Sequence, residues 1–185
     1  MAKGGIISAI HQGSLAEELE LVPGDKIISI NEQELTDIID LSFALADEEI
    51  EMLIEHENGE QEIIAFEKDM DEELGAEFES AVFGKIRQCA NNCYFCFVDQ
   101  VAPNMRDSLY IKDDDYRLSF LYGNFVTMTN MGPRDLERIH RLHLSPLYIS
   151  VHTTNPKLRG EMLRTKRGEL IMEQLAKLNE ADVQG

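Results

Sequence analysis

Apolar and polar residues alternate in several short segments of the first half of the chain. A period of two residues is typical of a strand that buries one face. The pattern predicts four strands, over residues 5–10, 26–30, 50–54 and 63–66. Asn58-Gly59 lies between the last two and predicts a hairpin turn, because this pair favours the positive φ angles of tight turns.

Two short helices are predicted between these strands. Ser14 is a suitable N-cap for the first, and Glu17 three residues later completes a capping-box pattern. Thr36 or Asp37 can cap the second, which carries Ile38 and further apolar residues on one side. The first eighty residues therefore predict a small β-rich domain with two helices.

The second half changes to an alternation of strand and helix patterns. Strands are predicted over residues 82–86, 125–129 and 147–151. Helices are predicted to follow Gly132-Pro133, Asn155-Pro156 and Gly168, since proline is favoured at the first helical position. This order predicts an α/β fold of parallel units, whose chemistry lies at the C-terminal ends of the strands.

Charge divides the chain at the same place. Residues 1–80 hold 23 Asp and Glu against 3 Lys and Arg, whereas residues 81–185 hold 12 against 14. We therefore expect two domains, 1–80 and 81–185. The acidic first domain would repel phosphate backbones, which argues against nucleic-acid binding. The start of the chain lacks a signal-peptide pattern, and no apolar run has the length of about 18 residues that spans a bilayer, so we expect a cytoplasmic protein without a membrane partner.

The three cysteines of the chain, Cys89, Cys93 and Cys96, lie together in CANNCYFC. An odd number argues against a closed disulfide framework, and structural zinc would need a fourth ligand, such as a histidine from elsewhere. Three thiolates suit a [4Fe–4S] cluster that leaves one iron without a protein ligand. A metal-free buried cluster is disfavoured, because Asn91 and Asn92 are loop-type residues.

This spacing, with Phe95 just before the last cysteine, resembles the signature of the radical SAM superfamily. The resemblance implies that the three cysteines hold a [4Fe–4S] cluster. It also implies that S-adenosylmethionine (SAM) binds the open iron, that a flavodoxin- or ferredoxin-like donor supplies an electron, and that a 5′-deoxyadenosyl radical forms. The cofactors carry out the difficult step, and the protein orients and shields them.

The longer runs CANNCYFCFVDQ, KDDDYRLSFLYGNFVT and LSPLYISVHTTNP resemble, more narrowly, radical SAM iron–sulfur proteins that carry an N-terminal PDZ-like domain. These are described as iron–sulfur oxidoreductases. The resemblance implies that residues 81–185 are the first three β/α units of a partial TIM barrel. Because the chains of that family continue further, we expect this one to be an N-terminal fragment.

The resemblance also suggests residues that contact SAM. Phe95 would approach the adenine. Thr129 and Asn130 stand where many relatives carry a Gly-Gly-Glu segment that holds the amino group of SAM, although the glutamate is absent here. His152, just past the third predicted strand, would face the mouth of the barrel. A plain strand end is the alternative interpretation of residues 129–130.

Two other groups of polar residues are weaker candidates for sites. The run Asp113-Asp114-Asp115 would be a cation site or, as we expect, a solvated loop in which Asp115 pairs with Arg117. His140 and His143 lie three residues apart on a predicted helix, where surface histidines are a better interpretation than a metal pair.

The run GSLAEELELVPGDKIISINEQEL resembles a bacterial PDZ domain that covers about residues 4–80. PDZ domains bind a terminal carboxylate in a Leu-Gly-x-x-Phe-type loop, and here that pattern comes late, at residues 74–78, which implies a circular permutation. The acidic residues around it oppose an anionic ligand; they are Glu72, Glu73, Glu77 and Glu79. A peptide reader and a docking domain that reads no C-terminus both remain open.

Three classes of function follow. The leading one is a radical SAM enzyme with a PDZ-like docking domain. The alternative is a PDZ-type peptide- or protein-binding module whose cysteine loop holds a structural metal. A simple electron carrier is the third, and three cysteines argue against it, because carriers usually close all four iron positions.

Overall fold

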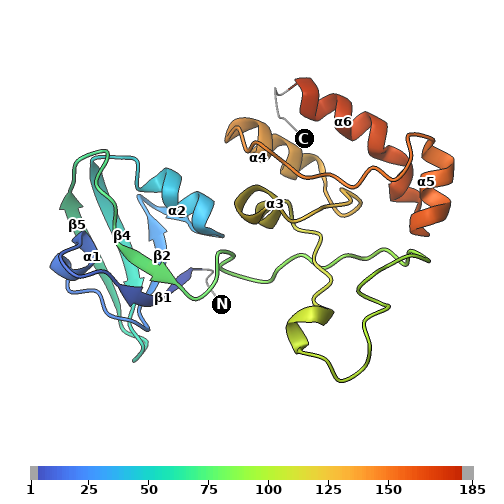
Figure 1. Cartoon of the computed structure of the whole chain (residues 1–185). Helices are drawn as coiled ribbons and strands as arrows, with labels where there is room; N and C mark the ends of the chain where they lie inside the picture. Colours follow the sequence, from blue (N-terminus) through green and yellow to red (C-terminus); the bar gives the residue numbers. More distant parts are fainter. Residues whose placement is uncertain (1–3, 181–185) are drawn as a thin grey trace. The chain divides into compact units, whose positions relative to one another are not determined.

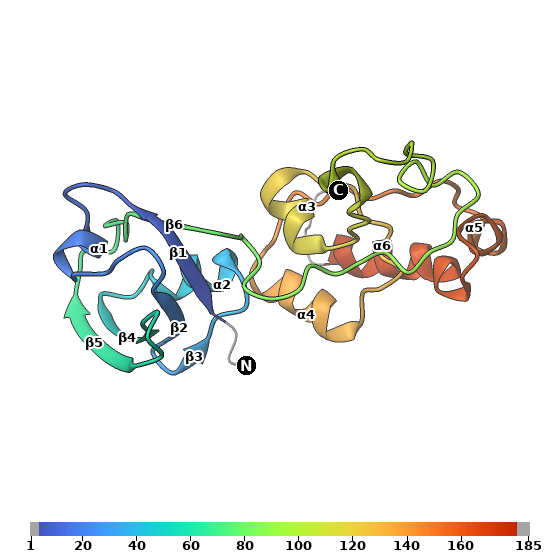
Figure 2. The ribbon, with the colours of Figure 1, turned by 90° about the horizontal axis from the view of Figure 1, so that it is seen from below.

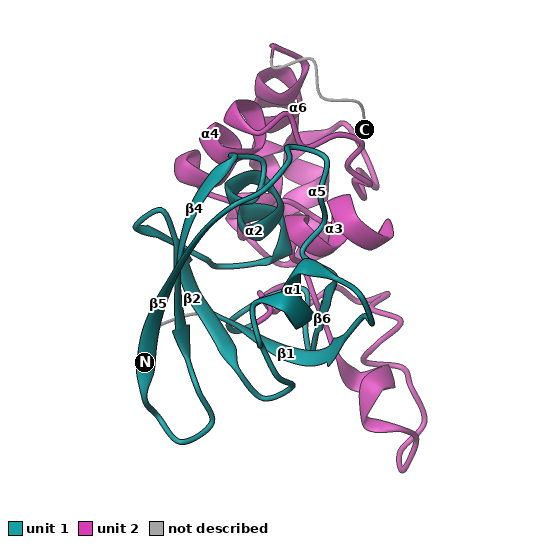
Figure 3. Cartoon of the chain, turned by 90° about the vertical axis from the view of Figure 1, so that its left-hand side faces the viewer, with its two compact units in different colours: residues 1–85 teal, residues 86–185 magenta. Residues whose placement is uncertain are grey.

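The computed structural model describes residues 4–180, and the chain divides into two compact units, residues 1–85 and 86–185 (Figure 3). The first unit contains a sheet and two helices, whereas the described part of the second is built from helices and irregular segments (Figure 1). The chain is therefore mixed α/β, with its sheet first. Within residues 4–180, no helix has the length and apolarity needed to cross a membrane.

Six strands form one antiparallel sheet in the first unit. Their order is β5-β4-β2-β1-β6, with the short β3 paired to β2. The strands are β1 (Gly5–Ile10), β2 (Lys26–Ile30), β3 (Gln33–Glu34), β4 (Glu49–Glu55), β5 (Gln61–Glu67) and β6 (Ala76–Phe78). The four predicted strands and the hairpin between β4 and β5 are confirmed.

Both predicted helices of this unit are present, as α1 (Leu15–Glu18) and α2 (Ile38–Ala44). Ser14 caps α1, since its hydroxyl accepts the Glu17 amide, and the Glu17 side chain accepts the amide of Gly13. Asp37 caps α2 by accepting the amides of the second and third helical residues at 3.1 and 3.0 Å. These caps satisfy amides that a helix start otherwise leaves without partners.

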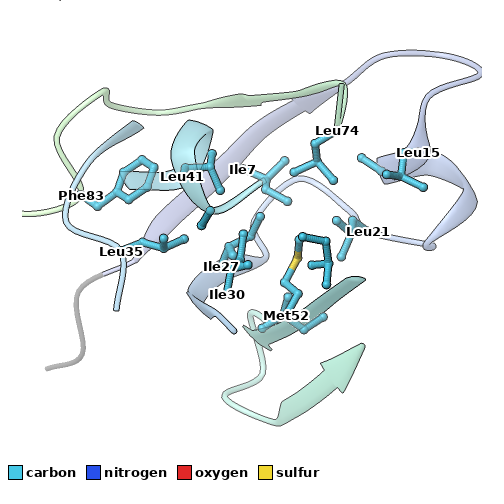
Figure 4. Packing of buried hydrophobic residues seen from close by; sticks show 14 residues of the cluster. Ile7, Leu15, Leu21, Ile27, Ile30, Leu35, Leu41, Met52, Leu74 and Phe83 are labelled. Atoms are coloured by element: carbon cyan, nitrogen blue, oxygen red, sulfur yellow. The ribbon is translucent and has the colours of Figure 1, made fainter. Parts of the chain in front are cut away.

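The apolar faces of the sheet and of both helices meet in one core (Figure 4). Alternation along β4 buries every second residue, which is the pattern expected of a half-buried strand. Among the most deeply buried side chains are Ile7, Ile27, Ile30, Leu35, Met52 and Ile54.

The Leu74-Gly75 loop joins the core to the last strand of the sheet. Gly75 has a φ of +71°, and a Cβ atom there would lie 2.3 Å from the Cβ atom of Ser14. The Gly75 carbonyl accepts the His11 amide, and β6 then pairs antiparallel with β1. The loop strand thus lies at the end of the unit, as the predicted circular permutation requires.

The prediction of a strand over residues 82–86 is wrong. Val82 forms only an isolated antiparallel bridge with Asp37, and the Phe83 amide donates to the Thr36 carbonyl. The Phe83 ring packs 5.3 Å from the Phe78 ring within the core of the first unit. The backbone of this segment therefore bonds to the loop before α2 and cannot form a first barrel strand.

The second unit contains four α-helices and two 3₁₀ helices within its described residues. They are η1 (Asp107–Tyr110), α3 (Tyr116–Tyr122), α4 (Pro133–Arg141), α5 (Pro156–Leu163), η2 (Lys166–Leu170) and α6 (Ile171–Glu180). The three predicted helices correspond to α4, α5 and α6, and both proline starts are confirmed. Figure 2 shows α4 beside α6, which it contacts. The sequence also predicts that the last helix ends at Gly185, and these final residues lie outside the described part of the chain.

The strands predicted over residues 125–129 and 147–151 are extended segments rather than strands. They meet at one parallel bridge between Val126 and Ile149, where the Val126 carbonyl accepts the Ser150 amide at 2.8 Å. Met128 and His152 each have a φ of +61°, which ends the extended conformation after two or three residues. The predicted parallel direction is present, but residues 86–180 do not form a barrel.

Candidate metal and cofactor site

The three cysteines lie in a segment without helix or strand, residues 89–106. All three thiols are unpaired and half-buried. The Cys89 amide donates to the Lys112 carbonyl at 2.7 Å, and the Cys96 amide donates to the Cys93 carbonyl at 3.3 Å. Among the described residues, no group of three His, Cys, Asp or Glu side chains is arranged to hold a metal ion. Burial raises the pKa of the Cys89 and Cys93 thiols, so metal binding there must release protons.

Asn91 connects the cysteine loop to the extended segment that follows α3. Its side-chain amide donates to the Thr127 hydroxyl at 2.9 Å and accepts from the Thr129 hydroxyl at 2.8 Å. Asn91 and Thr129 are both buried. A buried asparagine with both ends bonded fixes the position of its backbone, so the loop between the first two cysteines is held against residues 127–129.

Asp114 lies under this connection and is 1% exposed. Its carboxylate accepts the backbone amide and the hydroxyl of Thr127, the latter at 2.7 Å. Burial raises the pKa of Asp114, although the hydrogen bonds from Thr127 and Thr129 oppose that rise. The prediction of a solvated loop is therefore wrong at this position, because the carboxylate is buried and bonded to Thr127.

Asp115 is also buried, and its predicted pairing with Arg117 is confirmed. Two oxygens of Asp115 accept from the guanidinium at 2.8 and 2.6 Å, and one of them also accepts the Arg117 amide to cap α3. Burial alone would raise the pKa of this carboxyl, but the Arg117 guanidinium holds it below its usual range. The carboxylates of Asp114 and Asp115 are therefore both engaged within the fold.

Asn130 presents a buried hydrogen-bond acceptor at the end of the segment that holds Thr129. Its side-chain nitrogen donates to the Asp114 carbonyl at 2.9 Å. Its Oδ1 atom is buried, and no group of residues 4–180 donates to it. A buried acceptor without a partner is uncommon and costs about 1–3 kcal/mol. Such an atom is suited to accept from a ligand.

Phe95 and His152 come together although 57 positions separate them in the chain. Their ring centroids lie 5.2 Å apart, with a tilt of 46° between the planes. Burial lowers the pKa of His152, and the nearby charge of Arg159 lowers it further. His152 is therefore a neutral imidazole at neutral pH. Two of the predicted cofactor residues thus form one contact beside the cysteine loop.

Arg159 on α5 is a further buried cation of this region, and the sequence patterns did not identify it. Its side chain is fully buried, and it forms no ion pair among the described residues. The guanidinium donates instead to four backbone carbonyls at 2.8–2.9 Å, those of Thr127, Ser150, Val151 and Gly168. It therefore joins the two extended segments at their C-terminal ends, where the candidate site lies.

His140 and His143 belong to no such cluster. Both are exposed at the end of α4, and their rings lie 6.3 Å apart. Surface histidines remain the better interpretation.

Two family models match the chain. The model of a Radical SAM-like domain matches residues 68–184, and that of a PDZ domain matches residues 6–56. No curated protein matches the chain closely enough to indicate a relative. The first match covers more than half of the sequence and includes all three cysteines. The chain therefore belongs to the radical SAM-like family and carries a PDZ domain at its N-terminal end.

Proposed function

We propose that the chain is a radical SAM enzyme that reductively cleaves SAM to release a 5′-deoxyadenosyl radical. The observation that carries this proposal is the cysteine loop itself. Three unpaired thiols lie on one segment, and Asn91 ties that segment to Thr129, beside the unpartnered acceptor of Asn130.

The donor set fits a [4Fe–4S] cluster. Each thiolate of Cys89, Cys93 and Cys96 would bind a separate iron, so the three sulfur atoms need not converge on one point. The fourth iron would be left for SAM. When bound, these two groups supply the one-electron cleavage of a sulfonium C–S bond, and the residues of the chain position them.

The surrounding residues suit the parts of SAM. The Oδ1 atom of Asn130 would accept a hydrogen bond from the amino group and would so replace the absent glutamate. The hydroxyl of Thr129 keeps this segment in register with the cysteine loop. The Phe95 and His152 rings offer a stacking surface for the adenine, and the neutral His152 adds no charge there.

We also propose the cellular setting that this chemistry requires. A flavodoxin- or ferredoxin-like protein delivers the electron, and the cytoplasm keeps the thiols reduced. The extended segments that meet at Val126 and Ile149 run parallel, as neighbouring strands of a β/α fold do. We place the domain boundary near residue 85, because Val82 and Phe83 bond and pack within the first unit.

The PDZ domain serves as a docking module in this proposal. Four exposed glutamates surround the Leu74-Gly75 loop; they are Glu72, Glu73, Glu77 and Glu79. Their charge disfavours a free terminal carboxylate, so the domain binds a protein surface without reading a C-terminus. A terminal carboxylate peptide that binds the chain more tightly than its C-terminal amide would contradict this role.

Iron and sulfide content after anaerobic reconstitution tests the cluster assignment. We expect about four irons for each wild-type chain, and loss of the cluster in Cys89→Ala, Cys93→Ala and Cys96→Ala. Asn92→Ala is the matched control, because this exposed residue lies in the same loop and should leave loading unchanged. A colourless wild-type chain with one bound zinc would instead support a PDZ-type binding module with a structural metal.

A further inference from the structure

Lys112 lies outside the cysteine motif but contacts the cysteine loop at several points. Its backbone carbonyl accepts the Cys89 amide at 2.7 Å. Its ammonium group donates to the Asn91 carbonyl at 3.2 Å and to the Asp99 carboxylate at 2.8 Å. One residue outside the loop thus holds it at its beginning, near its middle and after its last cysteine.

The same ammonium group forms an ion pair with Asp99, three residues after the third cysteine, at 2.8 Å. A lysine side chain is cationic at neutral pH. Its bond to the Asn91 carbonyl places this cation against the segment between the first two cysteines. Asp99 and Lys112 therefore form a charged pair at the edge of the loop.

This arrangement has a direct consequence for a cluster bound at the loop. Three thiolates and an oxidised [4Fe–4S] core together carry a net charge of about −1, and reduction adds one more negative charge. A cation or an N–H donor at a ligand sulfur stabilises the reduced form more than the oxidised form. Lys112 provides the cation, whereas the Asp99 carboxylate opposes it.

We propose that Lys112 is a positioning residue that holds the cysteine loop and raises the reduction potential of the cluster bound there, and that Asp99 limits this rise. The inference rests on the proposed function, since it needs a cluster at the three cysteines. It assigns opposite electrostatic effects to two neighbouring residues, which a purely structural role does not predict.

Lys112 is well suited to substitution. Its side chain is 24% exposed and that of Asp99 is 50% exposed, so neither belongs to the core. Lys112→Arg keeps the charge, Lys112→Gln removes it, and Asp99→Asn leaves Lys112 without its opposing charge. Lys177→Gln is the matched control, because Lys177 is exposed on α6.

The test is an anaerobic redox titration of the reconstituted chain, followed by the paramagnetic resonance signal of the reduced cluster. We expect the potential to fall in Lys112→Gln, to rise in Asp99→Asn, and to stay near the wild-type value in Lys112→Arg and Lys177→Gln. An unchanged potential in Lys112→Gln overturns the inference. If Lys112→Gln loads no cluster, Asp99→Asn provides the test. A potential of Asp99→Asn at or below the wild-type value then overturns the inference. A wild-type chain that takes up no cluster refutes the proposed function instead.

Discussion

Replacement of Arg159 by methionine tests how the second unit holds its extended segments together. Methionine has a similar length and no charge, so it fills the space without donating hydrogen bonds. Four carbonyls lose the guanidinium, but the Val151 carbonyl also accepts the Thr153 amide and keeps that partner. The carbonyls of Thr127, Ser150 and Gly168 lose the bonds on which the site region depends.

The expected loss of stability follows from these three groups. A buried polar group that loses its partner costs about 1–3 kcal/mol, and relief from burying a charge offsets part of that loss. We therefore expect Arg159→Met to destabilise the second unit by about 3 kcal/mol. That is a large part of the 5–15 kcal/mol typical of a folded domain.

Tyrosine fluorescence during urea unfolding is a suitable assay. The chain has no tryptophan, and its five tyrosines all lie between residues 94 and 148, so the signal reports on the second unit. Arg141→Met is the matched control, because Arg141 is exposed at the end of α4 and should change the free energy of unfolding by no more than about 0.5 kcal/mol. A loss below about 1 kcal/mol for Arg159→Met would refute the reasoning.

Two further predictions concern the first unit, and calorimetry of the full chain measures both. Gly75→Ala should lower the stability of this unit by about 1–3 kcal/mol, because φ is positive and the new Cβ atom meets Ser14. Gly13→Ala is the control, since Gly13 has a φ of +72° and open space around it, and it should lower the stability less. Equal losses in the two variants would contradict the predicted clash with Ser14. Hydrogen bonds to Asp25 and Glu62 raise the pKa of His56, so protonated His56 stabilises the fold below about pH 6.5, and this stabilisation is lost as the pH rises through the folded-state pKa. His56→Gln should therefore destabilise the unit more at about pH 6 than at about pH 9, and an equal effect at both would contradict this sign.

Local patterns were sufficient to predict most of the first unit. Its strands alternate with a period of two, its turn carries Asn58-Gly59, and its helix caps are Ser14 and Asp37. Each of these signals depends on a few neighbouring residues, so it does not depend on contacts with distant parts of the chain. Residues 82–86 have the same strand-like composition, but Phe83 fills a slot beside Gly5 and Phe78, and this contact depends on distant parts of the chain.

For the candidate site, the sequence predicted the three cysteines and some of the residues around them. A fixed spacing identified the thiols, whereas nothing in the sequence indicated that Asp114 and Arg159 are buried, because charged residues are usually solvated. Only the fold shows that Asp114 accepts from Thr127 and that Arg159 donates to four carbonyls. Lys112 was likewise hidden, since its contacts reach back to residues 89–99.

The central claim is that SAM binds the open iron of a cluster held by the cysteine loop. The most direct measurement is electron–nuclear double resonance of the reduced, reconstituted chain with SAM labelled at its amino nitrogen. Binding at the open iron predicts a hyperfine coupling from the labelled nitrogen, and Asn130→Ala should weaken SAM binding without loss of iron. A reduced cluster whose spectrum is unchanged by excess SAM would contradict the claim.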